Sequence, residues 1–450
     1  MAALLAFSFV FGGASRQHEL RLALVELVAL PLLAISTLAL LRSETQAGSR
    51  LAFGVLAALV LVPLLQLLPL PAGLWTNLPG RSELVLALNL SDVPAGWSGI
   101  SLTPERTWRS FLALLPPVAM FLGVLACPGD FRRRLGLPII AMTVLAVALG
   151  SAQLASGGER LYPWATTDAG NVVGFFANRN HLATLCLISL PFATVLGAAA
   201  LRRRSQGSLT LWLAILFIGL IVVALGVIRS RAGLLLVWPT LAVSLIASWI
   251  ASGRGRPDIR LLAIAGAVTI AVIALAAFAL DPIVARFNAG GTPEGRFENW
   301  PIVLQAADTY LPVGSGMGSF DAVYRSVEPL NRLDATYFNQ AHNEYLESWL
   351  EAGWMGAGVL ALFLFWFSRR AWAAWTARPS TERDLQRAAS IAIGVVLLHS
   401  VADYPLRTVT ISTLFALCCG LLELAHRSDV DLDAGRRAGH GRARRENRRT

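Results

Sequence analysis

Long apolar runs alternate with short arginine clusters along most of the chain, and this alternation constrains the fold more than any other feature. About 20 apolar residues suffice for a helix that crosses a bilayer. Only 15% of the residues are charged, whereas soluble domains carry about a quarter. The sequence therefore predicts an all-α, polytopic membrane helix bundle of about 12 spans. The expected spans are residues 2–13, 22–41, 51–70, 108–126, 136–155, 181–200, 209–228, 232–250, 261–280, 346–368, 388–404 and 409–425.

The arginines give this bundle a direction. Clusters at 132–134, 202–204, 254–260 and 369–387, together with the tail after 426, all fall on one side of the predicted spans. Cytoplasmic loops are rich in basic residues, so that side is expected to be cytoplasmic. The same placement accounts for the net charge of +10 without a nucleic-acid partner, and none is expected.

The predicted topology divides the chain into five parts. They are an N-terminal transmembrane bundle (1–170), central transmembrane helices with an outer-face arginine turn (171–280), a large outer loop between spans nine and ten (281–345), C-terminal transmembrane helices (346–428) and a disordered cytoplasmic tail (429–450). The large loop is rich in aromatic residues, which argues against disorder. We expect it to form a small cap with short helices.

Two further features narrow the class of protein. The apolar N-terminus lacks a basic n-region, so it is expected to form a short first span, inserted fully or only half-way, rather than a cleaved signal peptide. The cysteines lie within or at the edges of apolar runs, at Cys127, Cys186, Cys418 and Cys419. Their positions and spacing suggest neither a disulfide framework nor a zinc site.

Arginines on the outer side are not explained by the positive-inside rule. Arg229 and Arg231 flank a tight turn between two expected spans. They either snorkel to lipid headgroups or bind an anion, because a planar guanidinium donates paired hydrogen bonds to a diphosphate. Arg296, early in the large loop, either pairs with Glu294 or Glu298 or belongs to an anion site.

His342 and Asn343 stand where the large loop re-enters the membrane. A histidine at the water boundary titrates near neutrality and can accept a proton from a sugar hydroxyl. The alternative is a helix-capping or interfacial role for His342.

Two other segments place polar side chains at the outer ends of spans. HSVADYPLRT contains Asp403 and Arg407, which form either a structural ion pair or a supporting part of a site; His399 and Asp403, four residues apart, share a helix face. GFFANRNH contains Arg179 and His181. Helix capping explains its asparagines but not Arg179.

These motifs together resemble the O-antigen ligase and polymerase family of bacterial membrane glycosyltransferases. In that family, a His-Asn or His-Ser pair follows the large periplasmic loop, and nine residues separate it from Gly-x-x-Gly. Here His342-Asn343 precedes Gly353 and Gly356 with residues 344–352 between them.

Two arginine motifs and the segments GFFANRNHLA and HSVADYPLR, which resemble recurrent segments of many members, extend the resemblance over roughly residues 170–410. A Ser-Arg-Gly-like outer turn is matched by Ser230-Arg231-Ala232, with alanine in place of the usual glycine. An arginine followed by a tryptophan early in the loop is matched by Arg296 and Trp300.

The resemblance implies a metal-independent, inverting glycosyltransferase in the bacterial inner membrane, with no cofactor. The donor would be a glycan on undecaprenyl diphosphate, the acceptor lipid A-core or another glycan on the periplasmic face, with membrane lipids around the protein. His342 would be the general base. The diphosphate would be bound by Arg229, Arg231 and Arg296, with supporting roles for Asn343, Arg179, His181, Asp403 and Arg407. An Asp-x-Asp pattern occurs at 429–433, on the expected cytoplasmic side, so no metal site is expected on the outer face.

Several alternatives stay open on the sequence. Ligation to lipid A-core, repeat-unit polymerisation of O-antigen or exopolysaccharide, and transfer to protein share the motifs; we favour the ligase description, with the polymerase as closest alternative. A lipid-linked sugar transporter is an alternative of another class. Transporters often place ionisable groups near mid-membrane, whereas the polar candidates here lie at the outer boundary. A purely structural protein gives no reason for outer arginines.

Overall fold

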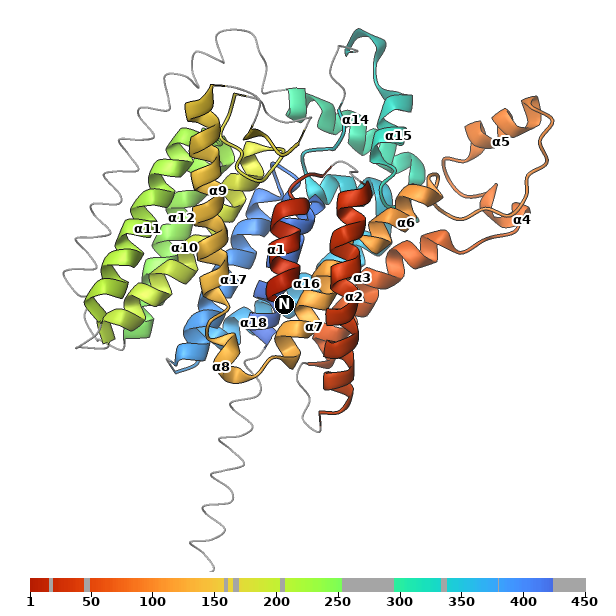
Figure 1. Cartoon of the computed structure of the whole chain (residues 1–450). Helices are drawn as coiled ribbons and strands as arrows, with labels where there is room; N and C mark the ends of the chain where they lie inside the picture. Colours follow the sequence, from red (N-terminus) through yellow and green to blue (C-terminus); the bar gives the residue numbers. More distant parts are fainter. Residues whose placement is uncertain are drawn as a thin grey trace, which may run out of the picture.

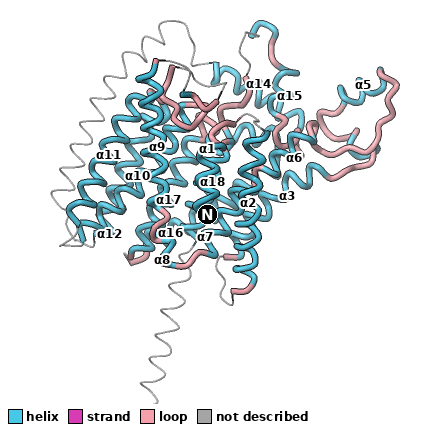
Figure 2. Tube along the Cα trace, in the orientation of Figure 1, coloured by secondary structure: helices cyan, strands magenta, loops and turns pink. Residues whose placement is uncertain are grey.

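The computed structural model describes residues 1–15, 19–43, 49–157, 161–164, 170–202, 207–252, 295–332, 338–378 and 380–423. Within these ranges the regular structure is helical, apart from an isolated β-bridge between Leu70 and Ser98 (Figure 2). The longer helices run side by side in a bundle (Figure 1). The expected all-α membrane bundle is therefore confirmed.

The bundle is built from long helices with shorter elements at their ends. The long helices are α2 (Glu19–Leu41), α3 (Arg50–Leu67), α9 (Gly136–Ser156), α10 (Arg179–Arg202), α11 (Gly207–Ile228), α12 (Arg231–Ser252), α16 (Glu344–Thr376) and α17 (Thr381–His399). The shorter elements are α1 (Ala2–Phe11), α4 (Ala72–Trp75), α5 (Ser82–Leu90), α6 (Pro104–Leu112), α7 (Leu115–Ala126), α8 (Gly129–Arg132), α14 (Gly295–Tyr310), α15 (Phe320–Val327), η2 (Leu330–Arg332), η3 (Pro405–Arg407) and α18 (Val409–Glu423).

Eight stretches in the described part of the chain are long and apolar enough to cross a membrane. They are 19–41, 50–67, 104–126, 129–156, 179–200, 209–228, 231–250 and 344–376. α1 and α18 are apolar but shorter, and α17 begins at Thr381 with charged first turns, rather than at 388. The expected span 261–280 lies outside the described residues, so the number of about 12 spans stays a prediction.

The flanks of these helices are apolar, as a lipid environment requires. Large hydrophobic side chains are exposed along α2 and α11, among them Leu27, Ile35, Leu213 and Leu216. In water such contiguous surface would drive association. Its position on long apolar helices indicates contact with acyl chains, so the protein is a multi-pass membrane protein.

α10 forms the buried centre of one half of the bundle. Leu182, Leu185 and Leu190 are completely buried, and α10 packs against α9, α11, α12 and α17. Its first turn therefore sits at a fixed point among several helices. The last three residues of the GFFANRNH segment, Arg179 to His181, belong to this turn.

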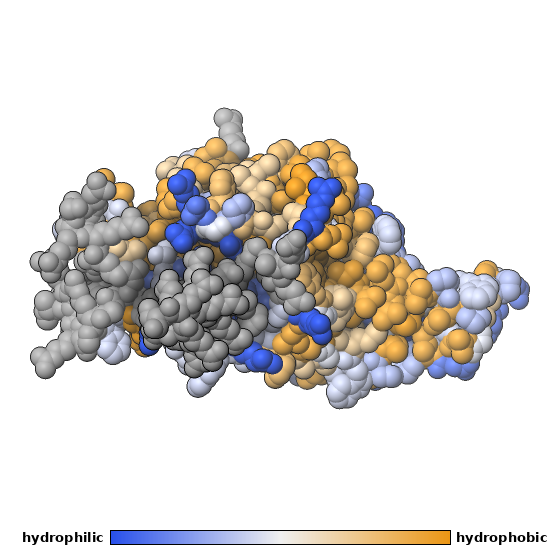
Figure 3. All heavy atoms as spheres, turned by 90° about the horizontal axis from the view of Figure 1, so that it is seen from below, coloured by the Kyte–Doolittle hydropathy of each residue, from blue (hydrophilic) through white to orange (hydrophobic). Residues whose placement is uncertain are grey.

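The two ends of the bundle differ. α8 lies at one end, where Arg133 approaches Glu382 at the start of α17 with 3.8 Å between Nη2 and Oε1. Seen from that end, hydrophilic side chains gather around the middle and the flanks are largely hydrophobic (Figure 3). α14 and α15 lie at the opposite end (Figure 1), so the large loop contains the expected short helices.

α16 is broken at Gly353, and the break fixes the large loop onto the bundle. Gly353 has φ +52 and ψ −136, which interrupts the helical hydrogen bonds. The freed Leu350 carbonyl accepts from the Ser315 amide at 3.0 Å, and the Trp354 amide donates to the Pro312 carbonyl at 3.0 Å. Loop backbone thus replaces the missing helical bonds, as an apolar environment demands.

A buried glutamine of α3 also binds both the break in α16 and the large loop. Gln66 of α3 is fully buried; its side-chain amide donates to the Glu351 carbonyl at 2.8 Å and accepts from the Met317 amide at 2.9 Å. The loop after α14, the break in α16 and α3 are therefore one packed unit. The first two turns of α16 project from this unit toward α17.

Candidate functional site

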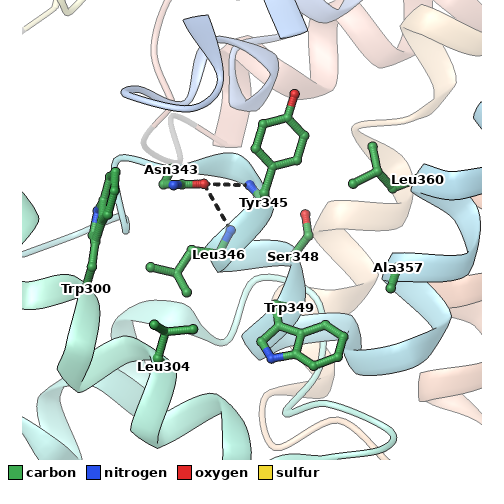
Figure 4. Close-up of a pocket in the computed structure, with 10 residues that line it drawn as sticks. Trp300, Leu304, Asn343, Tyr345, Leu346, Ser348, Trp349, Ala357 and Leu360 are labelled. Atoms are coloured by element: carbon green, nitrogen blue, oxygen red, sulfur yellow. Dashed lines mark hydrogen bonds between the residues drawn. The ribbon is translucent and has the colours of Figure 1, made fainter. Parts of the chain in front are cut away.

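The His342 backbone takes a left-handed conformation immediately before α16. Its φ of +49 is uncommon for a residue with a Cβ and is often found at functional positions. Asn343 is the N-cap of α16, where its Oδ1 accepts from the amides of Tyr345 at 3.0 Å and Leu346 at 3.1 Å (Figure 4). Asn343 thus ends the loop and starts the helix, which fixes the direction in which the His342 side chain leaves the backbone.

The His342 ring lies against a buried carboxylate. Its Nδ1 is 3.6 Å from Oδ1 of Asp403, and the two side chains are 12% and 1% exposed. Tyr404 packs against the ring edge-on with 4.8 Å between centroids, and Phe338 packs at 5.6 Å. A carboxylate on Nδ1 favours the tautomer with its proton there, so Nε2 becomes the basic nitrogen.

Asp403 is held by the first turn of α10. The Asn180 side-chain amide donates to its Oδ2, and the Tyr404 amide donates to its Oδ1 at 2.9 Å. Asp403 also donates its amide to the His399 carbonyl at 3.0 Å, which extends the last turn of α17. The carboxylate is therefore fixed by α10 and by the neighbouring Tyr404 amide, and it faces the ring of His342.

The other residues of GFFANRNH surround this contact. His181 is 1% exposed and its ring lies 5.2 Å from that of Tyr404, edge-on. Arg179 donates to Oδ1 of Asn171 at 2.8 Å. The structure thus brings His181 next to the His342–Asp403 pair, whereas Arg179 binds the loop before α10.

Arg407 does not join Asp403 in the ion pair expected from their spacing. It binds three glutamates of α16 instead. Its Nη2 is 3.0 Å from Glu351 and 3.3 Å from Glu347, and its Nε is 3.7 Å from Glu344. Burial opposes the charge of the guanidinium, but the attraction of the carboxylates outweighs it and raises the pKa of Arg407. Arg407 stays charged and ties η3 to α16.

These glutamates were missed by the sequence analysis, although a signal was present. Glu344, Glu347 and Glu351 fall on one helix face with spacings of three and four residues. Acidic side chains on an otherwise apolar helix are costly unless they are paired. That pattern predicts a buried cationic partner, but only the fold identifies it as Arg407.

The arginine turn lies beside the start of α10. Arg229 has φ +54, and both Arg229 and Arg231 are exposed. Between them, the buried Ser230 hydroxyl accepts from the Gly233 amide at 3.1 Å and caps α12. A Cβ added to Gly233 would lie 2.9 Å from Cβ of Ala183. Both arginines therefore stand close to the first turns of α10.

The helix that carries Arg296 also contacts the His342 segment. Arg296 belongs to the first turn of α14, and its side chain lies outside the described part. Trp300, one turn later, donates its indole N–H to the Ala341 carbonyl at 3.1 Å. α14 is thus attached to the residue that precedes His342.

An apolar groove begins at this contact. It has a volume of about 510 Å³ and runs between α14 and α16. Trp300 and Leu304 face Leu346 and Trp349 across it, while Ala357 and Leu360 line it beyond the break in α16 (Figure 4). One end of the groove lies at Asn343, beside His342, and the other lies on the apolar part of a candidate span.

No cluster of three or more His, Cys, Asp or Glu side chains in the described ranges is arranged to hold a metal ion.

A family model described as O-antigen ligase matches residues 206–361. This segment includes the arginine turn, α14, His342 and the break at Gly353. This part of the chain is similar to the O-antigen ligase family. The match supports, in general terms, a ligase- or polymerase-type glycosyltransferase function, which in that family involves a lipid-linked glycan and a glycan acceptor. Comparison with curated proteins finds no match.

The family match does not cover all of the candidate site residues. Arg179, His181, Asp403 and Arg407 lie outside residues 206–361. The contacts of Asp403 with His342 and of Arg407 with α16 nevertheless join them to the matched segment. Residues after the matched segment in the sequence therefore contact it in the fold.

Proposed function

We propose that this O-antigen ligase-family protein transfers a glycan from undecaprenyl diphosphate to a hydroxyl of lipid A-core or a similar acceptor. The observation that carries the proposal is the His342–Asp403 pair, with 3.6 Å between Nδ1 and Oδ1, inside a segment that matches the family. A base beside a buried carboxylate is suited to remove a proton from an acceptor hydroxyl.

In the proposed reaction, the acceptor hydroxyl gives its proton to Nε2 of His342. Its oxygen attacks the anomeric carbon of the donor sugar, and the bond from that carbon to the diphosphate oxygen breaks. The bonding electrons leave with the diphosphate. One displacement inverts the anomeric configuration. Asp403 stabilises the imidazolium that forms, since its carboxylate faces Nδ1.

The leaving group is the second requirement. Undecaprenyl diphosphate gains negative charge as it departs, and arginines placed in advance stabilise this charge without a metal ion. Arg229 and Arg231 are exposed on the α11–α12 turn, and Arg296 belongs to α14. We assign the diphosphate to these three arginines, with Asn343, Arg179, His181, Asp403 and Arg407 in supporting roles.

The groove between α14 and α16 suits the lipid part of the donor. Its lining is mainly apolar and contains no charged residue. It leads from Asn343 onto the apolar part of α16, so a polyprenyl chain in it would reach the bilayer. With the arginine cluster of α8 in the cytoplasm, the site would face the periplasm of an inner-membrane protein, and residues 281–345 would form a periplasmic loop.

The test is glycan profiling of a deletion strain that is complemented with wild type or His342→Ala. A ligase is indicated if the deletion removes long glycans from the surface lipid and lipid-linked chains accumulate. A polymerase is indicated if single repeat units remain attached. His342→Ala should not restore the profile at normal membrane abundance. Full restoration by His342→Ala would exclude a catalytic role for this histidine.

A further inference from the structure

The first two turns of α16 carry three buried carboxyl groups. Glu347 and Glu351 are completely buried and Glu344 is 8% exposed. Arg407 is the cation that contacts all three carboxylates. Buried ion pairs often contribute little to stability, because desolvation offsets their attraction. A contribution to stability therefore does not by itself explain why three carboxylates surround one guanidinium.

Each carboxylate uses its two oxygens for different tasks. One oxygen faces Arg407, and the other accepts a backbone amide from outside α16. Glu344 accepts from Leu406 in η3 at 2.7 Å, and Glu351 accepts from Phe320 at the start of α15 at 3.1 Å. Glu347 accepts from Ala341 at 2.9 Å. Arg407 thus holds three carboxylates whose outer oxygens fix three separate pieces of backbone.

The bond of Glu347 acts on the residue directly before His342. The Ala341 amide is held by Glu347, and its carbonyl is held by the Trp300 indole at 3.1 Å. On the other side, Asn343 is fixed by its capping bonds. His342, with φ +49, stands between two immobilised residues. A residue with a Cβ keeps such a backbone conformation only where its surroundings enforce it.

We propose that Arg407, Glu344, Glu347 and Glu351 form a positioning hub for His342, and that Glu347 is the member that sets the imidazole against Asp403. The inference rests on the proposed function for its kinetic consequence, because it assumes that His342 handles the acceptor proton. The hub itself is defined by backbone contacts. Glu347 is a positioning residue, since it acts on His342 through the Ala341 peptide.

Glu347→Ala removes the carboxylate that holds the Ala341 amide. Arg407 stays paired with Glu344 and Glu351, so this variant should fold. A misplacement of a catalytic group by about 1 Å lowers the rate by about 100-fold. We expect a loss of kcat of about this size in Glu347→Ala, with the KM for the lipid-linked donor unchanged.

Glu347→Gln keeps the size of the side chain and an oxygen that can accept from the Ala341 amide. It should therefore recover most of the kcat that alanine loses. Glu83→Ala, an exposed carboxylate on α5, is the matched control and should behave as wild type. A merely structural role for Glu347 predicts less folded protein and an unchanged kcat per folded molecule. That result, or equal losses in the alanine and glutamine variants, would overturn the proposal.

A second measurement does not depend on catalysis. The full-length protein in detergent is labelled with diethyl pyrocarbonate, and the modification of His342 is followed by mass spectrometry. Release of the His342 segment should speed its labelling in Glu347→Ala, while the buried His399 keeps its rate. Unchanged labelling of His342 in Glu347→Ala would refute the hub. If wild type transfers no glycan but labelling responds as expected, the proposed function fails and the hub stands.

Discussion

Replacing Asp403 with asparagine tests the central pair of the proposed mechanism. Asparagine keeps the size of the side chain and an oxygen that can accept from the Tyr404 amide. The Asn180 side chain, which now donates to Asp403, can rotate its amide to face the new group. The substitution therefore removes the negative charge beside Nδ1 of His342 with little change in packing.

The size of the effect follows from the separation of the charges. An imidazolium and a carboxylate 3.6 Å apart attract each other by about 4.6 kcal/mol at an effective dielectric constant of about 20. If the proton is half transferred to His342 in the transition state, the variant loses about half of this attraction, which lowers kcat by about 50-fold. A completed proton transfer raises the loss to about 2,000-fold.

The assay is transfer of a fluorescent or radiolabelled glycan from the lipid-linked donor by purified protein in detergent or nanodiscs. Asp384→Asn is the matched control. Asp384 is a buried aspartate of α17 that pairs with Arg387 at 3.0 Å and does not face His342. This control should lower thermal stability and leave kcat per folded molecule intact. A kcat for Asp403→Asn within about twofold of wild type would mean that no imidazolium forms beside Asp403, which refutes the reasoning.

Two further substitutions test the fold and the leaving-group site. Gly353→Ala should lower the free energy of unfolding by at least about 2 kcal/mol, because an added Cβ at φ +52 would lie 2.4 Å from the Pro312 carbonyl oxygen. The control is Gly358→Ala, which should be neutral because no atom lies within 4 Å of its added Cβ. Equal melting temperatures for the two variants would contradict the account of the break in α16. Arg231→Ala should lower kcat/KM for the donor by about tenfold or more, and Arg231→Lys should recover little of this loss, because an ammonium cannot bind a diphosphate with a planar fork. Full recovery by lysine in a donor titration would show that charge alone suffices.

The bundle was predictable because its signals are local. Each apolar run of sufficient length predicts a helix, since a backbone in lipid must satisfy its own hydrogen bonds. α9, α11 and α12 accordingly lie close to the spans expected at 136–155, 209–228 and 232–250. The expected span at 388–404 began too late, because the buried, charged residues near the start of α17 (Arg383 to Arg387) do not resemble a span.

The candidate site was predictable in its parts and not in its pairings. His342 and Asn343 were placed correctly at the boundary between the loop and α16, because that boundary is a change in composition along the chain. Both partners of Asp403 precede it in the sequence: His342 lies more than 60 positions before it, and Asn180 lies more than 220 positions before it. Arg407 was expected to pair with Asp403 and binds the glutamates of α16 instead.

The sequence by itself determined the helical class, the apolar spans and the polar residues that stand at one end of them, because hydrophobic length and charge placement act within single segments. Only the tertiary structure decided which carboxylate faces His342, where α16 breaks and what holds Arg407. Each of these depends on atoms from several segments meeting in a buried place, where every charge and amide needs a partner. A pattern along one segment does not contain the identity of that partner.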